Sequence, residues 1–155
     1  MARLDPEHER LLAQWRAQGL TIVFTNGVFD LLHPGHLHVL EQARAMGDVL
    51  VVGLNTDESV QKLGKGEERP ILEHQARAKL LSALRVVDVV LLFDEETPLE
   101  LLKLVKPDVL VKGGDYQEHE VVGREMVNSW GGRVELVSLC PGYSTSGMIS
   151  RIRGQ

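Results

Sequence analysis

Apolar residues along this chain alternate between short continuous runs and longer stretches with helical spacing. The runs are rich in β-branched residues and are bounded by glycine, asparagine or proline, as buried strands are. They lie at residues 20–25, 49–54, 86–93, 109–111 and 134–137. Between them, apolar positions recur every three or four residues, which predicts helices at residues 1–19, 34–47, 73–84, 98–105, 121–130 and 144–152.

Strands that are apolar throughout and alternate with amphipathic helices are typical of a parallel sheet covered on both faces. We therefore predict an α/β fold, a single Rossmann-like domain with a parallel sheet of about five strands and helices on both faces. The domain is expected to span residues 1–155, with an N-terminal helix within 1–19 and the core in 20–153. The weakly patterned stretch 61–69 is expected to be a mobile loop.

Composition and charge narrow the classes of function. Hydrophobic residues make up 43% and charged residues 25% of the chain, close to the average of soluble globular proteins. The net charge of −5 provides no basic field, so we expect no nucleic-acid partner. No apolar run approaches the roughly 20 residues of a membrane span, and acidic residues precede the first apolar stretch, unlike a secretory signal. With Cys140 alone, no internal disulfide is expected, and we predict a cytoplasmic protein without a membrane partner.

The loop after the first predicted strand has unusual chemistry. Residues 25–36 read Thr-Asn-Gly-Val-Phe-Asp-Leu-Leu-His-Pro-Gly-His, so His33 and His36 flank a Pro-Gly pair at a predicted helix start. Histidines three residues apart at a helix start can face one point above the sheet. Ligands of open α/β sheets bind beyond the carboxyl ends of the strands, and a helix N-terminus favours phosphate. The loop therefore predicts a phosphate site in which two imidazoles stabilise transition-state charge.

Two other interpretations of His33 and His36 stay open at this point. One is a pair of capping or surface histidines. The other is a pair of metal ligands, but no cysteine or acidic cluster nearby completes a set. The metal ligands of the chain are therefore not predicted.

The loop after the fourth predicted strand is rich in glycine. Residues 112–116 read Lys-Gly-Gly-Asp-Tyr. Gly113 and Gly114 permit close approach of a ligand to the backbone, and Asp115 can accept hydrogen bonds from a base or ribose. An ordinary turn is the alternative interpretation.

Three hydroxyl residues precede the last predicted helix. Ser144, Thr145 and Ser146 are natural N-caps, and the same hydroxyls and amides can also hold an anion. The segment 141–149 is therefore a second candidate phosphate site.

Residues 26–36 resemble the hallmark of the cytidylyltransferase-like nucleotidyltransferases. That family includes glycerol-3-phosphate cytidylyltransferase and the heptose-1-phosphate adenylyltransferases of surface-polysaccharide synthesis. The likeness extends over about residues 20–153, and residues 112–116 resemble the heptose branch. Ser146 replaces the usual second threonine of the family's motif at the last helix. Residues 139–141 read Leu-Cys-Pro where the cytidylyltransferase branch typically has an arginine, which favours ATP over CTP.

The resemblance implies transfer of AMP from ATP, with Mg²⁺, to a sugar 1-phosphate of the heptose type, releasing pyrophosphate without a covalent enzyme intermediate. The implied catalytic residues are His33, His36 and Lys65. The implied nucleotide-binding residues are Asn26, Gly27, Val28, Phe29, Gly35, Gly113, Gly114, Asp115, Tyr143, Ser144, Thr145 and Ser146. The implied acceptor-binding residues are Asp30, Lys62 and Arg77. Which of the two lysines contacts phosphate stays open, and Asp30 can equally fix the histidine turn. Small enzymes of this family are often dimers, so we expect a homodimer.

Several alternative functions remain. Within the family they are a CTP-dependent glycerol-3-phosphate cytidylyltransferase, which uses a polyol phosphate, and adenylyl transfer to FMN. A non-catalytic nucleotide-binding module on the same fold is another. A dinucleotide-binding oxidoreductase is disfavoured, because the first strand is not followed by Gly-x-Gly-x-x-Gly.

Overall fold

Five parallel strands form one sheet, in the order β3-β2-β1-β4-β5. The computed structural model describes residues 2–155, so Met1 of the predicted domain lies outside the described residues. The strands are β1 (Ile22–Gly27), β2 (Val49–Asn55), β3 (Val89–Phe93), β4 (Val109–Gly113) and β5 (Arg133–Val137). The prediction of an α/β fold with a five-stranded parallel sheet is confirmed.

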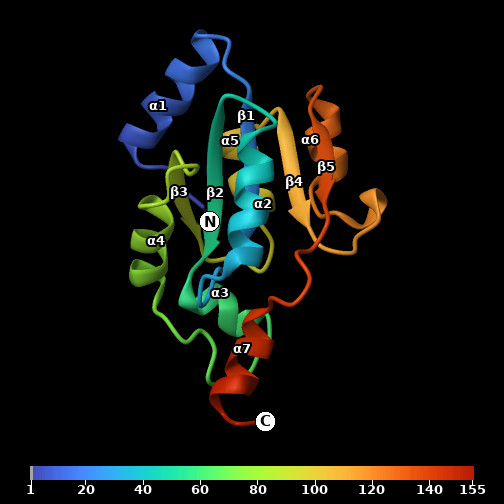
Figure 1. Cartoon of the computed structure of the whole chain (residues 1–155). Helices are drawn as coiled ribbons and strands as arrows, with labels where there is room; N and C mark the ends of the chain where they lie inside the picture. The colour runs from blue at the N-terminus through green and yellow to red at the C-terminus, as the bar shows by residue number, and fades with distance from the viewer. Residues whose placement is uncertain (1) are drawn as a thin grey trace.

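Helices cover both faces of this sheet, as predicted. They are α1 (Pro6–Ala17), α2 (Pro34–Arg44), α3 (Asp57–Lys62), α4 (His74–Ser82), α5 (Leu99–Val105), α6 (Arg124–Ser129) and α7 (Thr145–Ile152), with a 3₁₀ turn η1 (Glu118–Glu120). One core cluster joins the sheet to α1, α5 and α6, and the other joins it to α2 and α4. Figure 1 shows α2 in front of the sheet and α5 behind it. Each strand is thus enclosed between two apolar layers, which explains its continuous apolar sequence.

Helix α3 was not predicted from the sequence. It begins at the N-cap Thr56, whose Oγ1 accepts a hydrogen bond from the backbone N–H of Ser59 at 3.3 Å. The helix has six residues, and only Ser59 and Val60 are buried. So short a helix has no repeating apolar pattern for the sequence to show. Its last residue, Lys62, belongs to the helix, whereas residues 63–69 contain neither helix nor strand; the mobility of that segment stays a prediction.

The sheet opens between β1 and β4 at the carboxyl ends of these strands. Strand β1 pairs with β2 along its whole length, but its pairing with β4 is confined to Val23 and Phe24. Beyond them, Thr25 Oγ1 donates to the carbonyl of Val111 at 2.9 Å. The direction of chain connection reverses between these strands, which is where open α/β sheets bind ligands. Helix α7 lies beyond the same end of the sheet (Figure 1).

Candidate active site

A pocket of about 350 Å³ opens between the carboxyl ends of β1 and β4. We call it the first pocket. Its walls come from the loop after β1, the start of α2, the segment after α3, the end of β4 and the start of α7. Most residues expected to contact substrate line it: Asn26, Gly27, Val28, Phe29, Asp30, His33, Gly35, His36, Lys65, Gly113, Tyr143, Ser144, Thr145 and Ser146. The fold thus brings together segments that are more than one hundred residues apart in sequence.

The two histidines are held by each other's backbone. His33 is the N-cap of α2, and its Nδ1 accepts from the N–H groups of Gly35 at 3.0 Å and His36 at 3.3 Å. In return, Nδ1 of His36 accepts from the N–H of His33 at 3.3 Å. The two rings stack, with centroids 3.8 Å apart. Gly35 lies beneath them, and a Cβ there would meet His33 Cε1 at 2.8 Å, so this position requires glycine.

This arrangement fixes the tautomer that we infer for both rings. A ring nitrogen that accepts an N–H bond has no proton, so each neutral imidazole has its proton on Nε2. The capping interpretation is therefore correct for Nδ1 of both residues. Because both residues line the first pocket, capping leaves each Nε2–H available to a ligand there.

Both histidines favour the neutral form. Burial lowers the pKa of His33. For His36, burial and the nearby charge of His33 lower the pKa to about 4, although Asp30 acts in the opposite direction. Near pH 7 the two rings therefore offer hydrogen-bond donors rather than positive charge.

Positive charge in the first pocket comes from Lys65, Arg69 and Lys112. Burial lowers the pKa of Lys112, and the charge of Lys65 lowers it further. Burial also lowers the pKa of Lys65, with a second contribution from the charge of Arg69. Lys65 therefore lies close enough to repel both Lys112 and Arg69. An acidic protein that binds an anion needs such a local cluster.

Sequence reasoning did not assign Arg69 or Lys112 to the site. For Lys112 there was a signal, because it directly precedes Gly113 in the segment already chosen. At the end of β4, its Nζ lies 5.2 Å from the centre of the Tyr116 ring. For Arg69 the signal was weaker: residues 69–71 read Arg-Pro-Ile, which resembles the heptose branch, but no role follows from that likeness.

Asp30 joins three separate segments. Its carboxylate, 1% exposed, accepts from Nε of Arg69 at 3.0 Å and from the N–H of Ile71 at 2.7 Å. A third bond comes from the N–H of Leu72 at 3.0 Å. Its backbone carbonyl accepts from Thr145 Oγ1 at 2.8 Å. Asp30 thus fixes the histidine loop to the arginine segment and to α7, which is the second of its two expected roles; contact of Asp30 with the acceptor stays a prediction.

The backbone around Asp30 has an uncommon conformation. Phe29 and Leu31 have φ angles of 49° and 51°, in the left-handed region that residues other than glycine seldom adopt. Such strain persists where surrounding contacts impose it, and it is frequent at functional sites. The four hydrogen bonds of Asp30 provide those contacts.

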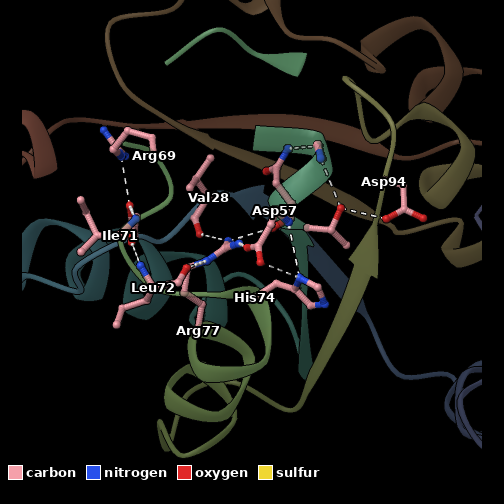
Figure 2. Close-up of polar contacts among 12 residues, drawn as sticks. Val28, Asp57, Arg69, Ile71, Leu72, His74, Arg77 and Asp94 are labelled. Carbon is pink, nitrogen blue, oxygen red and sulfur yellow. Dashed lines mark hydrogen bonds and ion pairs between the residues drawn. The ribbon is translucent and has the colours of Figure 1, made fainter. Parts of the chain in front are cut away.

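Arg77 is buried, with 1% of its surface exposed, and does not line the first pocket. Its Nη1 donates to the carbonyls of Val28 at 2.7 Å and Asn55 at 2.8 Å. Its Nε donates to the carbonyl of Leu72, and its Nη2 pairs with Asp57 at 2.7 Å. Figure 2 shows the guanidinium pointing toward Val28 and Asp57. The expectation that Arg77 binds the acceptor is therefore corrected: it joins the ends of β1 and β2 to α4.

Three other expected residues also lie outside the lining of the first pocket. Nζ of Lys62 donates to the carbonyl of Asp94 at 2.9 Å, so Lys65 is the lysine of this segment that faces the pocket. Gly114 donates its N–H to the carbonyl of Val137 at 3.0 Å, and Asp115 is exposed. Contact of Asp115 with a base or ribose stays a prediction.

Two further features bear on function. Within residues 2–155, no three His, Cys, Asp or Glu side chains are grouped so that they could hold a metal ion. In the same part of the chain, no helix has the length and apolar character needed to cross a bilayer.

Comparison with known proteins gives a consistent set of relatives. The sequence model of a family described as cytidylyltransferase-like matches residues 24–146. The bifunctional protein HldE of Azorhizobium caulinodans is 57% identical over 143 residues, which are 92% of this chain and 30% of that protein. The bifunctional protein HldE of Magnetococcus marinus is 56% identical over 93% of this chain and 29% of its own length. The chain thus spans about 30% of the length of these curated relatives.

A solved structure has the same fold. The lipopolysaccharide core biosynthesis protein from Thermoplasma volcanium superposes with a TM-score of 0.66 and 35% sequence identity. The match covers 79% of this chain and 98% of that one.

Proposed function

Because this chain belongs to the cytidylyltransferase-like family of nucleotidyltransferases, we propose that it transfers AMP from ATP to a sugar 1-phosphate of the heptose type and releases pyrophosphate. The observation that supports this most directly is the first pocket, which is lined by two histidines that favour the neutral form and by three cationic residues. The similar protein from Thermoplasma volcanium is named for lipopolysaccharide core biosynthesis, which supports a sugar phosphate as acceptor.

The proposed reaction is a single in-line displacement. An oxygen of the acceptor phosphate attacks the α-phosphorus of ATP, and the bond from that phosphorus to the bridging oxygen breaks, so that pyrophosphate leaves with the electron pair. An ionised phosphate is already a nucleophile, so no side chain needs to remove a proton. The enzyme contributes positioning and stabilisation of charge.

Each group of the first pocket has a role in this scheme. His33 and His36 donate hydrogen bonds to phosphate oxygens whose charge grows in the transition state. Lys65, Arg69 and Lys112 balance the charge of the triphosphate. The hydroxyl and amide groups at the start of α7 bind the same chain of phosphates.

Mg²⁺ is expected to enter with ATP. The only carboxylate lining the first pocket among the described residues is that of Asp30, and three hydrogen bonds already occupy it. This fits an ion held by substrate phosphates and water rather than by a protein cage. When bound, it neutralises phosphate charge.

The choice of ATP over CTP rests on the segment before α7. Leu139 and Cys140 line the first pocket at the position where cytidylyltransferases of this family typically have an arginine. A second proposal from the family resemblance is that the enzyme is a cytoplasmic homodimer, which size-exclusion chromatography with light scattering tests for the oligomeric state.

The decisive experiment measures pyrophosphate release with Mg²⁺ for ATP and CTP, each combined with heptose 1-phosphate and with glycerol 3-phosphate. We expect the highest kcat/KM for ATP with heptose 1-phosphate. Turnover with CTP and glycerol 3-phosphate alone would favour the cytidylyltransferase. Nucleotide binding without turnover of any acceptor would favour a non-catalytic module.

A further inference from the structure

The side chains of Asp30, Lys62 and Arg77 already bind protein groups, so the hydroxyls of an acceptor need other partners. A second pocket, of about 240 Å³, adjoins the first. The two share Asn26, Gly27 and Val28 at the end of β1, and the side chains of Lys65 and Lys112. The first pocket extends from this boundary toward α2, and the second extends toward α5 and η1. A molecule in the second pocket can therefore touch one in the first at the two lysines.

The chemical character of the lining changes across that boundary. Beyond the lysines, the second pocket is lined by the carboxylates of Glu96 and Glu120 and by the amide of Asn55. Asn55 is 3% exposed, and its amide nitrogen donates to Ser59 Oγ at 2.9 Å. Ionised carboxylates only accept hydrogen bonds, so they suit hydroxyl groups and repel phosphate. The triphosphate is therefore favoured in the first pocket, and a hydroxyl-bearing molecule in the second.

Glu96 and Glu120 come from different elements. Glu96 lies between β3 and α5, whereas Glu120 ends η1. One oxygen of Glu120 accepts from the backbone N–H of Gln117 at 2.8 Å, which orients the carboxylate. Leu110, Pro98 and Val121 supply an apolar part of the lining. Carboxylates beside apolar carbon match a sugar ring, which presents hydroxyls at its rim and C–H groups on its faces.

We propose that the second pocket binds the polyhydroxylated body of the acceptor, with its phosphate at Lys65 and Lys112 and its hydroxyls donating to Glu96 and Glu120. This deepens the proposed function and rests on it. In-line displacement requires the nucleophile and the leaving pyrophosphate to lie on opposite sides of the α-phosphorus. With the triphosphate along the histidine turn and α7, the open approach is from the shared boundary. The two carboxylates then select the acceptor without contacting the reacting atoms.

The variants Glu96→Gln, Glu120→Gln and the double variant test this assignment. Both glutamates are exposed, so the fold should survive. Glu118→Gln is the matched control, because Glu118 is an exposed carboxylate on η1 that lines neither pocket. We expect the KM for heptose 1-phosphate to rise about three- to tenfold per site, because the amide oxygen of glutamine still accepts a hydrogen bond, but a weaker one than the carboxylate accepts. The KM for ATP should change less than about twofold in these variants, and both KM values should change less than about twofold in Glu118→Gln.

Binding is measured separately by amide chemical shifts, with heptose 1-phosphate added to the full chain saturated with a non-hydrolysable ATP analogue. We expect the sugar phosphate to shift amides at 96–98 and 120–122, and the ATP analogue to shift those at 33–36 and 144–147. If the enzyme proves inactive but these shifts appear, the proposed function fails and the pocket assignment survives. Sugar-phosphate shifts confined to the first pocket, no binding at all, or an active double variant with unchanged KM would each overturn the assignment.

Discussion

Asp30 and Arg77 bind surrounding protein groups, whereas Lys65 and Lys112 lie at the boundary shared by the two pockets. Both pairs are charged, but their surroundings differ. The carboxylate of Asp30 accepts three hydrogen bonds, and every nitrogen of the Arg77 guanidinium donates to protein. The two lysines form no ion pair with residues 2–155, and burial lowers the pKa of each. The fold therefore disfavours their charge until an anion binds.

The comparison separates charges that hold the fold from charges reserved for a ligand. A buried charge whose hydrogen-bonding groups are all occupied cannot also bind substrate without breaking the structure. A cation that is partly desolvated and lacks an anionic partner is the opposite case. Saturation of hydrogen bonding, rather than the residue type or its place in a motif, distinguishes the two roles here.

The largest expected effect is on stability. Arg77→Met should lower the free energy of unfolding by about 3–5 kcal/mol, because it removes the buried partner of an ion pair and leaves three backbone carbonyls without this donor. Urea denaturation measures this. Lys79→Met, an exposed site on the same helix, is the control and should change stability by less than about 0.5 kcal/mol. An Arg77→Met protein of normal stability with a raised acceptor KM would restore the acceptor-binding assignment.

The next effect is on catalysis. In His36→Asn, the side-chain oxygen can still accept from the N–H of His33, but the Nε2–H donor is lost. We expect kcat for pyrophosphate release to fall about 10²- to 10³-fold, as when one oxyanion donor is removed. In His36→Gln the amide N–H lies farther out along the side chain, so kcat should fall less than in His36→Asn. Equal losses in both variants, together with lowered stability, would make capping the whole role of His36.

A smaller effect is expected on nucleotide affinity. Lys112→Met should raise the Kd for ATP, measured by calorimetry, about tenfold, the effect of one charge-assisted hydrogen bond. Lys62→Met is the matched control, because Nζ of Lys62 donates to the carbonyl of Asp94 and lines neither pocket. Equal effects of the two substitutions would show that net charge rather than placement determines affinity.

The smallest effect is on pH dependence. The pKa of His36, about 4, lies below its ordinary value of 6.5, so the unfolded chain binds more protons than the folded protein between these values. The contribution of His36 to stability is therefore complete above pH 6.5 and is lost as the pH falls toward 4. Urea denaturation at about pH 5 and about pH 7 should show a smaller decline for His36→Asn than for the original protein. An identical decline would contradict the lowered pKa.

Much of the fold could be predicted because the strands are buried on both faces. Val49–Asn55 is buried at every position, and its first six residues are apolar, which is typical of a strand enclosed between two layers. Gly27 and Gly113, which are the last residues of β1 and β4, indicated where these strands end. The missed helix α3 had a local signal in Thr56 and the acidic residues that follow, but no apolar face to draw attention to it.

The candidate site was predictable where a motif lies at a strand end, and less so elsewhere. The family resemblance implied that Arg77 binds the acceptor. Arg77 lies four residues before Leu81 on the buried face of α4. That spacing was visible in the sequence. Most of its partners were not, since three of them are the backbone carbonyls of Leu72, Val28 and Asn55. Any residue can supply a backbone group, so a backbone partner cannot be predicted from residue type. The hydrogen bonds that the backbone N–H groups of Ile71 and Leu72 donate to Asp30 could not be predicted for the same reason.

The shared boundary of the two pockets has a consequence for how this enzyme can diversify. On the nucleotide side, Asp30 links three segments, so a single substitution there disturbs all of them, and change requires compensating partners. On the other side, Glu96 and Glu120 are exposed and come from separate elements. Acceptor preference can therefore drift by single neutral steps while the phosphate chemistry stays fixed. Descendants of such a scaffold should differ first in the sugar that they accept and only much later in the nucleotide.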